Sequence, residues 1–203
     1  MYKIAVLISG GGTNLQAVID NIENGNLNCS LEAVISDNAK ATGIERAKSR
    51  GINTYVFDRK EYGSNLSDEI LKVVDEKVDL IVLAGFLSIL NGELIKKFKN
   101  KIINVHPSLI PSFCGNGMYG IKVHEAAINY GVKVSGCTVH LVDEGTDTGP
   151  IIVQKTVPVL NQDTPKELQN RVLVQEHLAL SEAIKKFSEG KVQIDGRKIV
   201  VTE

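Results

Sequence analysis

The first 105 residues alternate between short, largely apolar runs and segments with a helical pattern. The first run, at 4–8, is followed by three glycines and then by apolar residues at helical spacing from 15 to 22. Similar runs, which we expect to be strands, lie at 33–35, 54–57, 80–84 and 102–105. Runs that are apolar throughout must be covered on both faces, so these runs and the helices between them predict a parallel sheet built from βαβ units.

The second half of the chain is less regular. Prolines and glycines punctuate residues 106–119, which predicts a long ordered loop, and a helix is expected over 123–130. Two β-type runs follow at 133–142 and 151–159, and an acidic, glycine-containing loop separates them. We therefore expect antiparallel strands in this half.

The C-terminal part has strong helix and turn signals. Thr164, Pro165 and Glu167 predict a helix that starts with a capping box and ends near Gly190. A small hairpin with Asp195 and Gly196 at its turn should finish the chain.

These patterns together predict the fold class. It is a doubly wound, mostly parallel α/β sheet with a Rossmann-like N-terminal half and flanking helices. The C-terminal part should add antiparallel strands, a long helix and a small hairpin. We expect a single domain over 1–203, with halves at 1–105 and 106–203.

Charge and cysteine content restrict the partners. The 23 Lys and Arg residues balance 24 Asp and Glu residues, which leaves no basic surface typical of a protein that binds nucleic acid or membranes. The three cysteines have unrelated spacings, so neither a zinc site nor a disulfide framework is predicted. The apolar run at 4–8 is too short for a signal peptide or a membrane span, and we expect a cytoplasmic protein.

The glycine loop at 9–14 lies between the first predicted strand and a helix. Glycines let the backbone approach an oxyanion closely, and a helix N-terminus favours negative charge. Leu15 stands where a dinucleotide fingerprint needs another glycine, and no lysine precedes Thr13 as in a Walker loop. The loop therefore predicts a cradle for a single phosphate, with Thr13 and Asn14 as further donors. The alternative is a glycine-rich connection that binds nothing.

Asn104 and His106 are two residues apart in the fifth predicted strand, so they project from the same face. Pro107 ends that strand, which places both side chains at the carboxyl edge where open α/β sheets bind ligands. An amide and an imidazole can both donate hydrogen bonds to a developing oxyanion, and histidine can also move a proton. This pair indicates acyl transfer, although a histidine at a strand end is often structural.

Asp147 lies in the acidic loop at 143–150. It could orient His106, raise the pKa of that histidine and hold a water molecule, or the loop could be a solvated turn. His140 is either a core histidine or a functional one, and Cys114 and Cys137 are interpreted as packing residues.

Five motifs, in order along the chain, carry a resemblance to a known family. They are SGGGTNL at 9–15, AGF at 84–86, NVHPSLIP at 104–111, DTGP at 147–150 and RVLVQEH at 171–177. Together they resemble the phosphoribosylglycinamide formyltransferases over nearly the whole chain.

The resemblance implies a role for each matching position. It implies a catalytic triad of Asn104, His106 and Asp147. The residues implied to bind the phosphate and the rest of the ribonucleotide are Gly12, Thr13, Asn14, Leu173, Val174, Gln175 and Glu176. The residues implied to bind folate are Lys60, Leu87, Ser88, Ile89, Leu90, Asn104, Asp143, Glu144, Gly145, Thr146 and Asp147. Two departures are Ser88, where relatives carry arginine, and a longer, glycine-rich stretch at 113–122.

The implied reaction is attack by the amine of glycinamide ribonucleotide on the formyl group of 10-formyltetrahydrofolate. Asn104 and a protonated His106 would stabilise the oxyanion, while Asp147 keeps His106 charged and helps to move the proton. The resemblance implies no metal and no tightly bound cofactor, only the folate co-substrate, in a monomer or weak homodimer. The alternatives are a formyltetrahydrofolate hydrolase, which would carry a regulatory domain before the fold that begins here at Tyr2, and a non-catalytic nucleotide-binding module.

Overall fold

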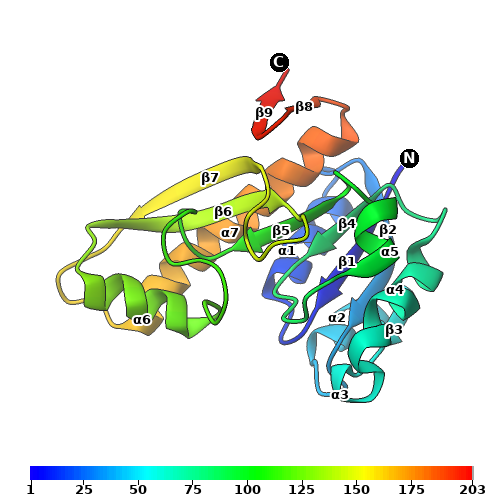
Figure 1. The fold of residues 1–203 in the computed structure, drawn as a ribbon, viewed down its shortest axis with the longest axis horizontal. Coiled ribbons are helices and arrows are strands. Elements are labelled where there is room, and N and C mark those ends of the chain that lie inside the picture. The colour runs from blue at the N-terminus through cyan, green and yellow to red at the C-terminus, as the bar shows by residue number, and fades with distance from the viewer. Residues whose placement is uncertain (203) are drawn as a thin grey trace. The chain divides into compact units, whose positions relative to one another are not determined.

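The computed structural model describes residues 1–202 (Figure 1). A seven-stranded sheet has the order β3-β2-β1-β4-β5-β6-β7, and β8 and β9 form a separate two-stranded sheet. By its internal contacts the chain divides into two compact units. The first unit holds residues 1–104 and 142–144, and the second holds 105–141 and 145–203.

Parallel strands form the framework of the first unit. They are β1 (Tyr2–Ile8), β2 (Cys29–Ser36), β3 (Thr54–Val56), β4 (Leu80–Leu83) and the beginning of β5 (Ile102–His106). Each neighbouring pair among these five strands is parallel. The order β3-β2-β1-β4-β5 is that of a doubly wound fold, which confirms the predicted fold class.

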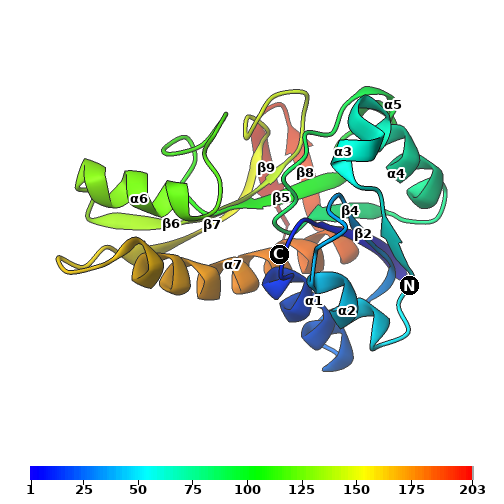
Figure 2. The same cartoon turned by 90° about the horizontal axis from the view of Figure 1, so that it is seen from below.

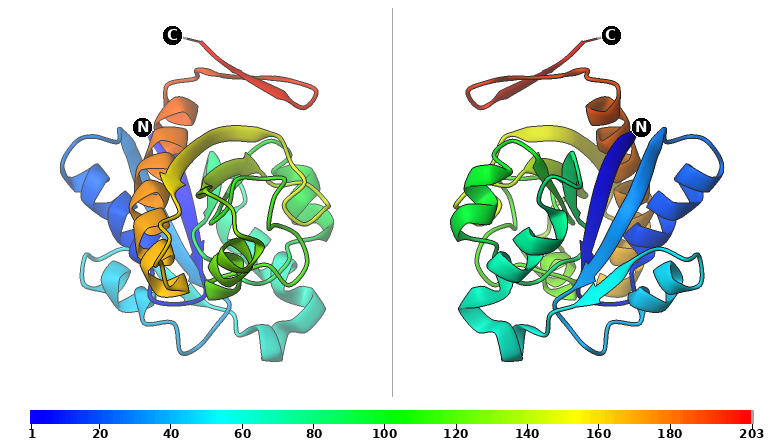
Figure 3. Two further views of the ribbon diagram at one scale, coloured as in Figure 1. Left: turned by 90° about the vertical axis from the view of Figure 1, so that its left-hand side faces the viewer. Right: turned by 90° about the vertical axis from the view of Figure 1, so that its right-hand side faces the viewer.

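Helices cover both faces of this parallel sheet. Helices α1 (Thr13–Glu23) and α2 (Gly43–Lys48) lie on one face, and α4 (Leu66–Val74) and α5 (Gly92–Lys97) lie on the other (Figures 2 and 3). Apolar side chains such as Leu7, Ile35 and Ile81 pack against α4 and α5 in a buried core. Burial on both faces explains why these strands are apolar throughout.

Three short elements of the first unit were not predicted. They are α3 (Arg59–Tyr62), the 3₁₀ turn η1 (Gly63–Asn65) and α5. Helix α5 buries only two side chains, Leu94 and Ile95, and α3 buries none, so neither has enough apolar residues to produce a periodic pattern.

The second unit is built around an antiparallel strand pair and a long helix. Strands β6 (Val134–Leu141) and β7 (Ile151–Pro158) pair antiparallel, and α7 (Pro165–Ser188) packs along both of them (Figure 1). Helix α6 (Ile121–Tyr130) also contacts α7. The buried side chains of α7 recur every three or four residues, and they are Leu168, Val172, Glu176, Ala179, Leu180, Ala183 and Ile184. The predicted antiparallel strands and long helix are confirmed.

The predicted capping box at the start of α7 is present. Thr164 Oγ1 accepts a hydrogen bond from the backbone N–H of Glu167, and the Thr164 N–H donates to Glu167 Oε2 at 2.8 Å. The chain then forms the hairpin of β8 (Val192–Asp195) and β9 (Lys198–Val201). Its two turn residues are Gly196 and Arg197, one position later than predicted, because Asp195 pairs with Lys198. Within residues 1–202 no helix is both long enough and apolar enough to cross a bilayer.

Candidate functional site

The glycine loop of the first unit holds its backbone against α2. Gly43 N donates to the carbonyl of Gly10 at 3.0 Å, and Arg46 Nε donates to the carbonyl of Gly11 at 2.7 Å. A trans peptide directs its carbonyl and its N–H in opposite directions, so the N–H groups of Gly11 and Gly12 point away from these partners. They are therefore placed to bind an anion.

Gly12 itself needs to be a glycine. Its φ of 67° lies in the left-handed region, and a Cβ there would stand 3.0 Å from Gly43 Cα. Helix α1 begins at the next residue, Thr13, so the first N–H groups of the helix have no acceptor within it. Thr13 is exposed, whereas Asn14 is buried. Backbone donors and the helix N-terminus thus lie in one short segment, and its role as an anion site stays a prediction.

The segment that follows β4 is attached to the same loop. Leu87 N donates to Ser9 Oγ at 2.8 Å, and Ser88 Oγ donates to Asp37 Oδ2 at 2.5 Å. Asp37 is fully buried, and the Arg59 guanidinium approaches its Oδ2 at 3.4 Å. The side chains of Leu87 and Ile89 remain exposed. The hydroxyl of Ser88 is thus engaged by a buried carboxylate, which the sequence did not reveal.

In the second unit His106 and Asp147 come together. Nδ1 of His106 lies 3.5 Å from Asp147 Oδ2, and both side chains are nearly buried. Nε2 of His106 lies 3.0 Å from the carbonyl oxygen of Phe113. Asn104, the third residue of the predicted triad, lies in β5 two residues before His106. The structure therefore joins the imidazole to the carboxylate as predicted.

Asp147 has a second histidine partner. His140 Nε2 lies 3.6 Å from Asp147 Oδ1, and the backbone N–H of Gly115 donates to Asp147 Oδ2 at 2.9 Å. His140 is buried at the end of β6, where its Nδ1 lies 2.8 Å from the carbonyl oxygen of Leu141. We call His106, Asp147 and His140 the histidine–aspartate cluster. The sequence left the role of His140 open, because β6 alone gives no sign of what its side chain meets.

The backbone contacts of the cluster indicate which ring nitrogens carry a proton. A carbonyl oxygen can only accept a hydrogen bond, so Nε2 of His106 and Nδ1 of His140 each carry a proton. The other nitrogen of each ring faces the carboxylate of Asp147. A further proton on Nδ1 of His106 would be stabilised by the carboxylate, so the pair of His106 and Asp147 can exchange a proton.

Burial opposes charge on both His106 and Asp147. It lowers the pKa of His106, and the neighbouring His140 lowers it further, against the opposing effects of the Phe113 carbonyl and Asp147. Burial alone would raise the pKa of Asp147. Other effects outweigh burial and lower the pKa of Asp147. The largest are the hydrogen bond from His140, the positive charge of His106 and the hydrogen bond from Gly115. Asp147 thus raises the pKa of His106, but by less than burial lowers it, and the expectation that Asp147 keeps His106 protonated stays a prediction.

The loop after His106 is fixed by side chains from the antiparallel strands. Thr138 Oγ1 donates to the carbonyl of Ser108 at 2.7 Å and accepts from Ile110 N at 3.0 Å. Gln154 Nε2 donates to the carbonyl of Ile110 at 3.0 Å. Phe113, with φ 49°, stacks edge-on against Tyr130 at a centroid distance of 5.8 Å. These contacts hold the carbonyl that binds His106.

His124 of α6 is a buried histidine that sequence reasoning missed. Neither of its ring nitrogens has a hydrogen-bond partner among residues 1–202, and it is 1% exposed. Burial, with the positive charges of His106 and Lys166, lowers the pKa of His124 to about 4. It lies in the second turn of a helix, where a single histidine gives no sequence signal.

The remaining predicted residues are spread over several elements. Lys60 is exposed in α3. Leu173, Val174, Gln175 and Glu176 lie in α7, where Glu176 is buried and Val174 exposed. Asp143, Glu144, Gly145 and Thr146 precede Asp147 in the loop between β6 and β7, and Thr146 is exposed. Cys137 is buried as predicted, whereas Cys114 is only partly buried.

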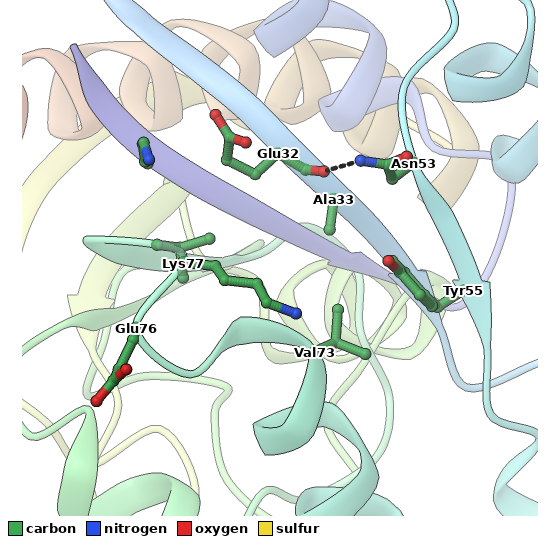
Figure 4. A pocket seen from close by; sticks show the side chains of 9 residues that line it. Glu32, Ala33, Asn53, Tyr55, Val73, Glu76 and Lys77 are labelled. Atoms are coloured by element: carbon green, nitrogen blue, oxygen red, sulfur yellow. Dashed lines mark hydrogen bonds between the residues drawn. The ribbon is translucent and has the colours of Figure 1, made fainter.

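A polar pocket of about 190 Å³ lies elsewhere in the first unit, near the amino ends of β1, β3 and β4 (Figure 4). Its wall includes Lys3, Glu32, Glu76 and Lys77, with charges of both signs, and Asn53 Nδ2 donates to the Glu32 carbonyl at 3.2 Å. None of the predicted site residues lines it. In residues 1–202 no three His, Cys, Asp or Glu side chains are grouped as metal ligands would be.

The chain is similar to known proteins over most of its length. Residues 2–184 match the formyl transferase family. The chain is 41% identical over 197 residues to the phosphoribosylglycinamide formyltransferase of Haemophilus influenzae, an alignment that covers 96% of this chain and 91% of that protein. It is 43% identical over 195 residues to the trifunctional purine biosynthetic protein adenosine-3 of Gallus gallus, which covers 95% of this chain but 19% of that protein. The chain therefore spans about a fifth of the length of this relative.

A solved structure shares the fold over the full length. Glycinamide ribonucleotide transformylase 1 from Symbiobacterium toebii superposes with a TM-score of 0.91 at 41% identity, covering 100% of this chain and 95% of that one. The chain therefore belongs to the formyl transferase family, and within it resembles the phosphoribosylglycinamide formyltransferases over nearly its whole length.

Proposed function

We propose that this protein transfers the formyl group of 10-formyltetrahydrofolate to the amine of glycinamide ribonucleotide. The observation that carries the proposal is the pairing of His106 with Asp147 at 3.5 Å, two residues after Asn104 in the chain. This arrangement provides hydrogen-bond donors for an oxyanion and a carboxylate that can accept a proton. The glycine loop adds a site for the phosphate of the ribonucleotide.

In the proposed reaction the neutral amine attacks the formyl carbon and a new C–N bond forms. The amide of Asn104 and the Nε2–H of His106 donate hydrogen bonds to the tetrahedral oxyanion, and for this His106 exchanges the Phe113 carbonyl for the substrate. Asp147, which is ionised because its pKa is lowered, accepts the amine proton through a water molecule. The bond between the formyl carbon and the folate nitrogen then breaks, and that nitrogen receives the proton.

We assign the binding roles by the family resemblance. Gly12, Thr13 and Asn14 hold the phosphate, and Leu173, Val174, Gln175 and Glu176 contact the rest of the ribonucleotide. The folate co-substrate contacts Lys60, the segment from Leu87 to Leu90, Asn104 and the loop from Asp143 to Asp147. The hydrogen bond from Leu87 N to Ser9 Oγ supports this assignment for the 87–90 segment, because it fixes that segment beside the glycine loop.

The test is an absorbance assay of folate deformylation with and without glycinamide ribonucleotide. The proposal expects deformylation only in the presence of the ribonucleotide, with one formylated product for each folate consumed. Equal rates with and without it would mean that the protein is a hydrolase. Binding of the ribonucleotide without any deformylation would mean a non-catalytic nucleotide-binding module.

A further inference from the structure

The C-terminal hairpin lies beyond residues 2–184, which match the family, yet it contacts the loop that carries Asp147. Arg197, at the hairpin turn, donates a hydrogen bond from Nη1 to the carbonyl oxygen of Thr148 at 2.9 Å. Thr148 directly follows Asp147. We propose that Arg197 is a positioning residue that holds the 143–150 loop, and through it the carboxylate of Asp147. The inference rests on the proposed function of Asp147.

The loop needs such a restraint because its backbone is strained at Asp147. The φ of Asp147 is 57°, a left-handed conformation that few residues with a Cβ adopt, although aspartate adopts it more often than most. On one side, the Asp147 carboxylate is anchored by the Gly115 N–H at 2.9 Å. On the other side, the Leu141 N–H donates to the Pro150 carbonyl at 2.8 Å, and Gly149 packs so closely that a Cβ would stand 1.8 Å from Leu141 O. Thr148 lies exposed between these two anchors.

The hydrogen bond from Arg197 fixes this middle position. It restrains the Thr148 carbonyl, and therefore the direction in which the backbone leaves Asp147. Without it, the loop between the two anchors can rotate around Thr148 and draw the carboxylate away from the 3.5 Å contact with His106.

The hairpin can act as a restraint because it is itself held in place. A two-stranded hairpin alone is only marginally stable, but β9 contacts β7, the strand that follows the 143–150 loop. At the base of the hairpin Thr202 N donates to the Lys191 carbonyl at 3.0 Å. At the tip, Gly196 has φ 57°, which a two-residue turn with glycine first requires. The tip therefore presents Arg197 at a defined place.

The test compares Arg197→Ala with Arg197→Lys and with the neighbouring Lys198→Ala, which removes a positive charge from the same hairpin. All three are made in the full-length protein. The measurements are kcat, KM for each substrate, the thermal midpoint, and hydrogen exchange of the peptide that covers 143–150.

For Arg197→Ala we expect faster exchange in 143–150 and a fall in kcat of roughly tenfold, because small displacements of a reacting group are costly. The KM for formyl folate should rise and the KM for the ribonucleotide should stay unchanged. Arg197→Lys should recover part of kcat, since lysine can donate one hydrogen bond to Thr148, and Lys198→Ala should behave as wild type.

Three outcomes would overturn the inference. The first is unchanged kinetics in Arg197→Ala, and the second is an equal fall in kcat in Lys198→Ala. The third is a fall in kcat in Arg197→Ala that accompanies a lower thermal midpoint and is not recovered in Arg197→Lys. If the wild-type protein transfers no formyl group, the proposed function fails instead. The exchange of 143–150 in Arg197→Ala would still show whether Arg197 restrains the loop.

Discussion

The glycine loop of the first unit presents backbone N–H groups, whereas the histidine–aspartate cluster of the second unit presents buried side chains. In the glycine loop the carbonyls of Gly10 and Gly11 are bound by α2, and the opposite N–H groups point away from these partners. In the cluster the arrangement is reversed: backbone groups of Phe113, Leu141 and Gly115 bind the side chains.

This difference has consequences for binding and for chemistry. A site made of backbone N–H groups requires residues without a Cβ, and these groups do not titrate with pH. A site made of buried ionisable side chains depends on their protonation and on the loops that orient them. We therefore expect substitutions in the glycine loop to change affinity for the ribonucleotide, and substitutions in the cluster to change turnover.

The largest expected effect is that of His106→Ala. Removing an oxyanion donor typically lowers turnover about a hundred- to a thousandfold, and Asn104→Ala should have a similar effect. The KM for the ribonucleotide should change little, because the glycine loop is intact. Steady-state kinetics with circular dichroism as a folding control measures both. Near-native kcat in either variant would remove that residue from the reaction.

The next largest effect concerns the pH dependence of stability around His124. In the unfolded chain this histidine takes up a proton near pH 6.5, but in the folded protein its pKa is about 4, so the free energy of unfolding decreases as the pH falls from 6.5 to 4. Between these two pH values, protonation of His124 lowers the free energy of unfolding by on the order of 2–3 kcal/mol. Asp147, whose pKa lies below its ordinary 3.8, adds a loss only at still lower pH.

His124→Leu should remove this part of the pH dependence. Urea unfolding at pH 7 and pH 4.5 should show a smaller difference between the two pH values in the variant than in the wild type. Stability at pH 7 should be retained, because a buried imidazole without hydrogen-bond partners is replaced by an apolar side chain. An unchanged difference would show that His124 is not the group responsible.

A smaller effect is expected from Gly12→Ala, with Gly25→Ala as its control. Both glycines have positive φ, so both variants should lose about 1 kcal/mol of stability. Only at Gly12 would the new Cβ meet another backbone, at 3.0 Å, whereas at Gly25 nothing lies within 4 Å. The KM for the ribonucleotide should rise roughly tenfold in Gly12→Ala alone, as expected for about 1.4 kcal/mol of lost binding. Equal KM values in the two variants would mean that the loop does not hold the phosphate.

The smallest effect is expected from Arg46→Ala. This change removes the hydrogen bond to the Gly11 carbonyl, worth about 1 kcal/mol, and should raise the KM for the ribonucleotide by about fivefold with kcat retained. Arg50→Ala is the matched control, because Arg50 pairs with Glu23 on the surface instead. If Arg46→Ala lowered kcat without changing the KM for the ribonucleotide, the glycine loop would not act in binding alone, contrary to the comparison with the histidine–aspartate cluster.

The first unit could be predicted from the sequence more completely than the second. Buried parallel strands such as β1 and β4 are apolar at every position, and glycine marks the loop that needs a positive φ, so residue types report the structure directly. Helices α3 and α5 escaped prediction because they bury too few side chains.

In the second unit the decisive partners have no residue signature. Every residue supplies a carbonyl like that of Phe113, and every residue except proline supplies an N–H like that of Gly115. His140 comes close to Asp147 only because β6 pairs with β7. The sequence could therefore indicate His106 and Asp147 as a pair. It could not reveal that burial lowers the pKa of His106.

The hydrogen bond between Arg197 and Thr148 also has a practical consequence for handling the protein. A fluorescent label attached to β8 or β9 would lie on the strand pair that presents Arg197. We expect assays on a protein labelled there to report a perturbed reaction loop, whereas a label on α4 would leave that contact untouched.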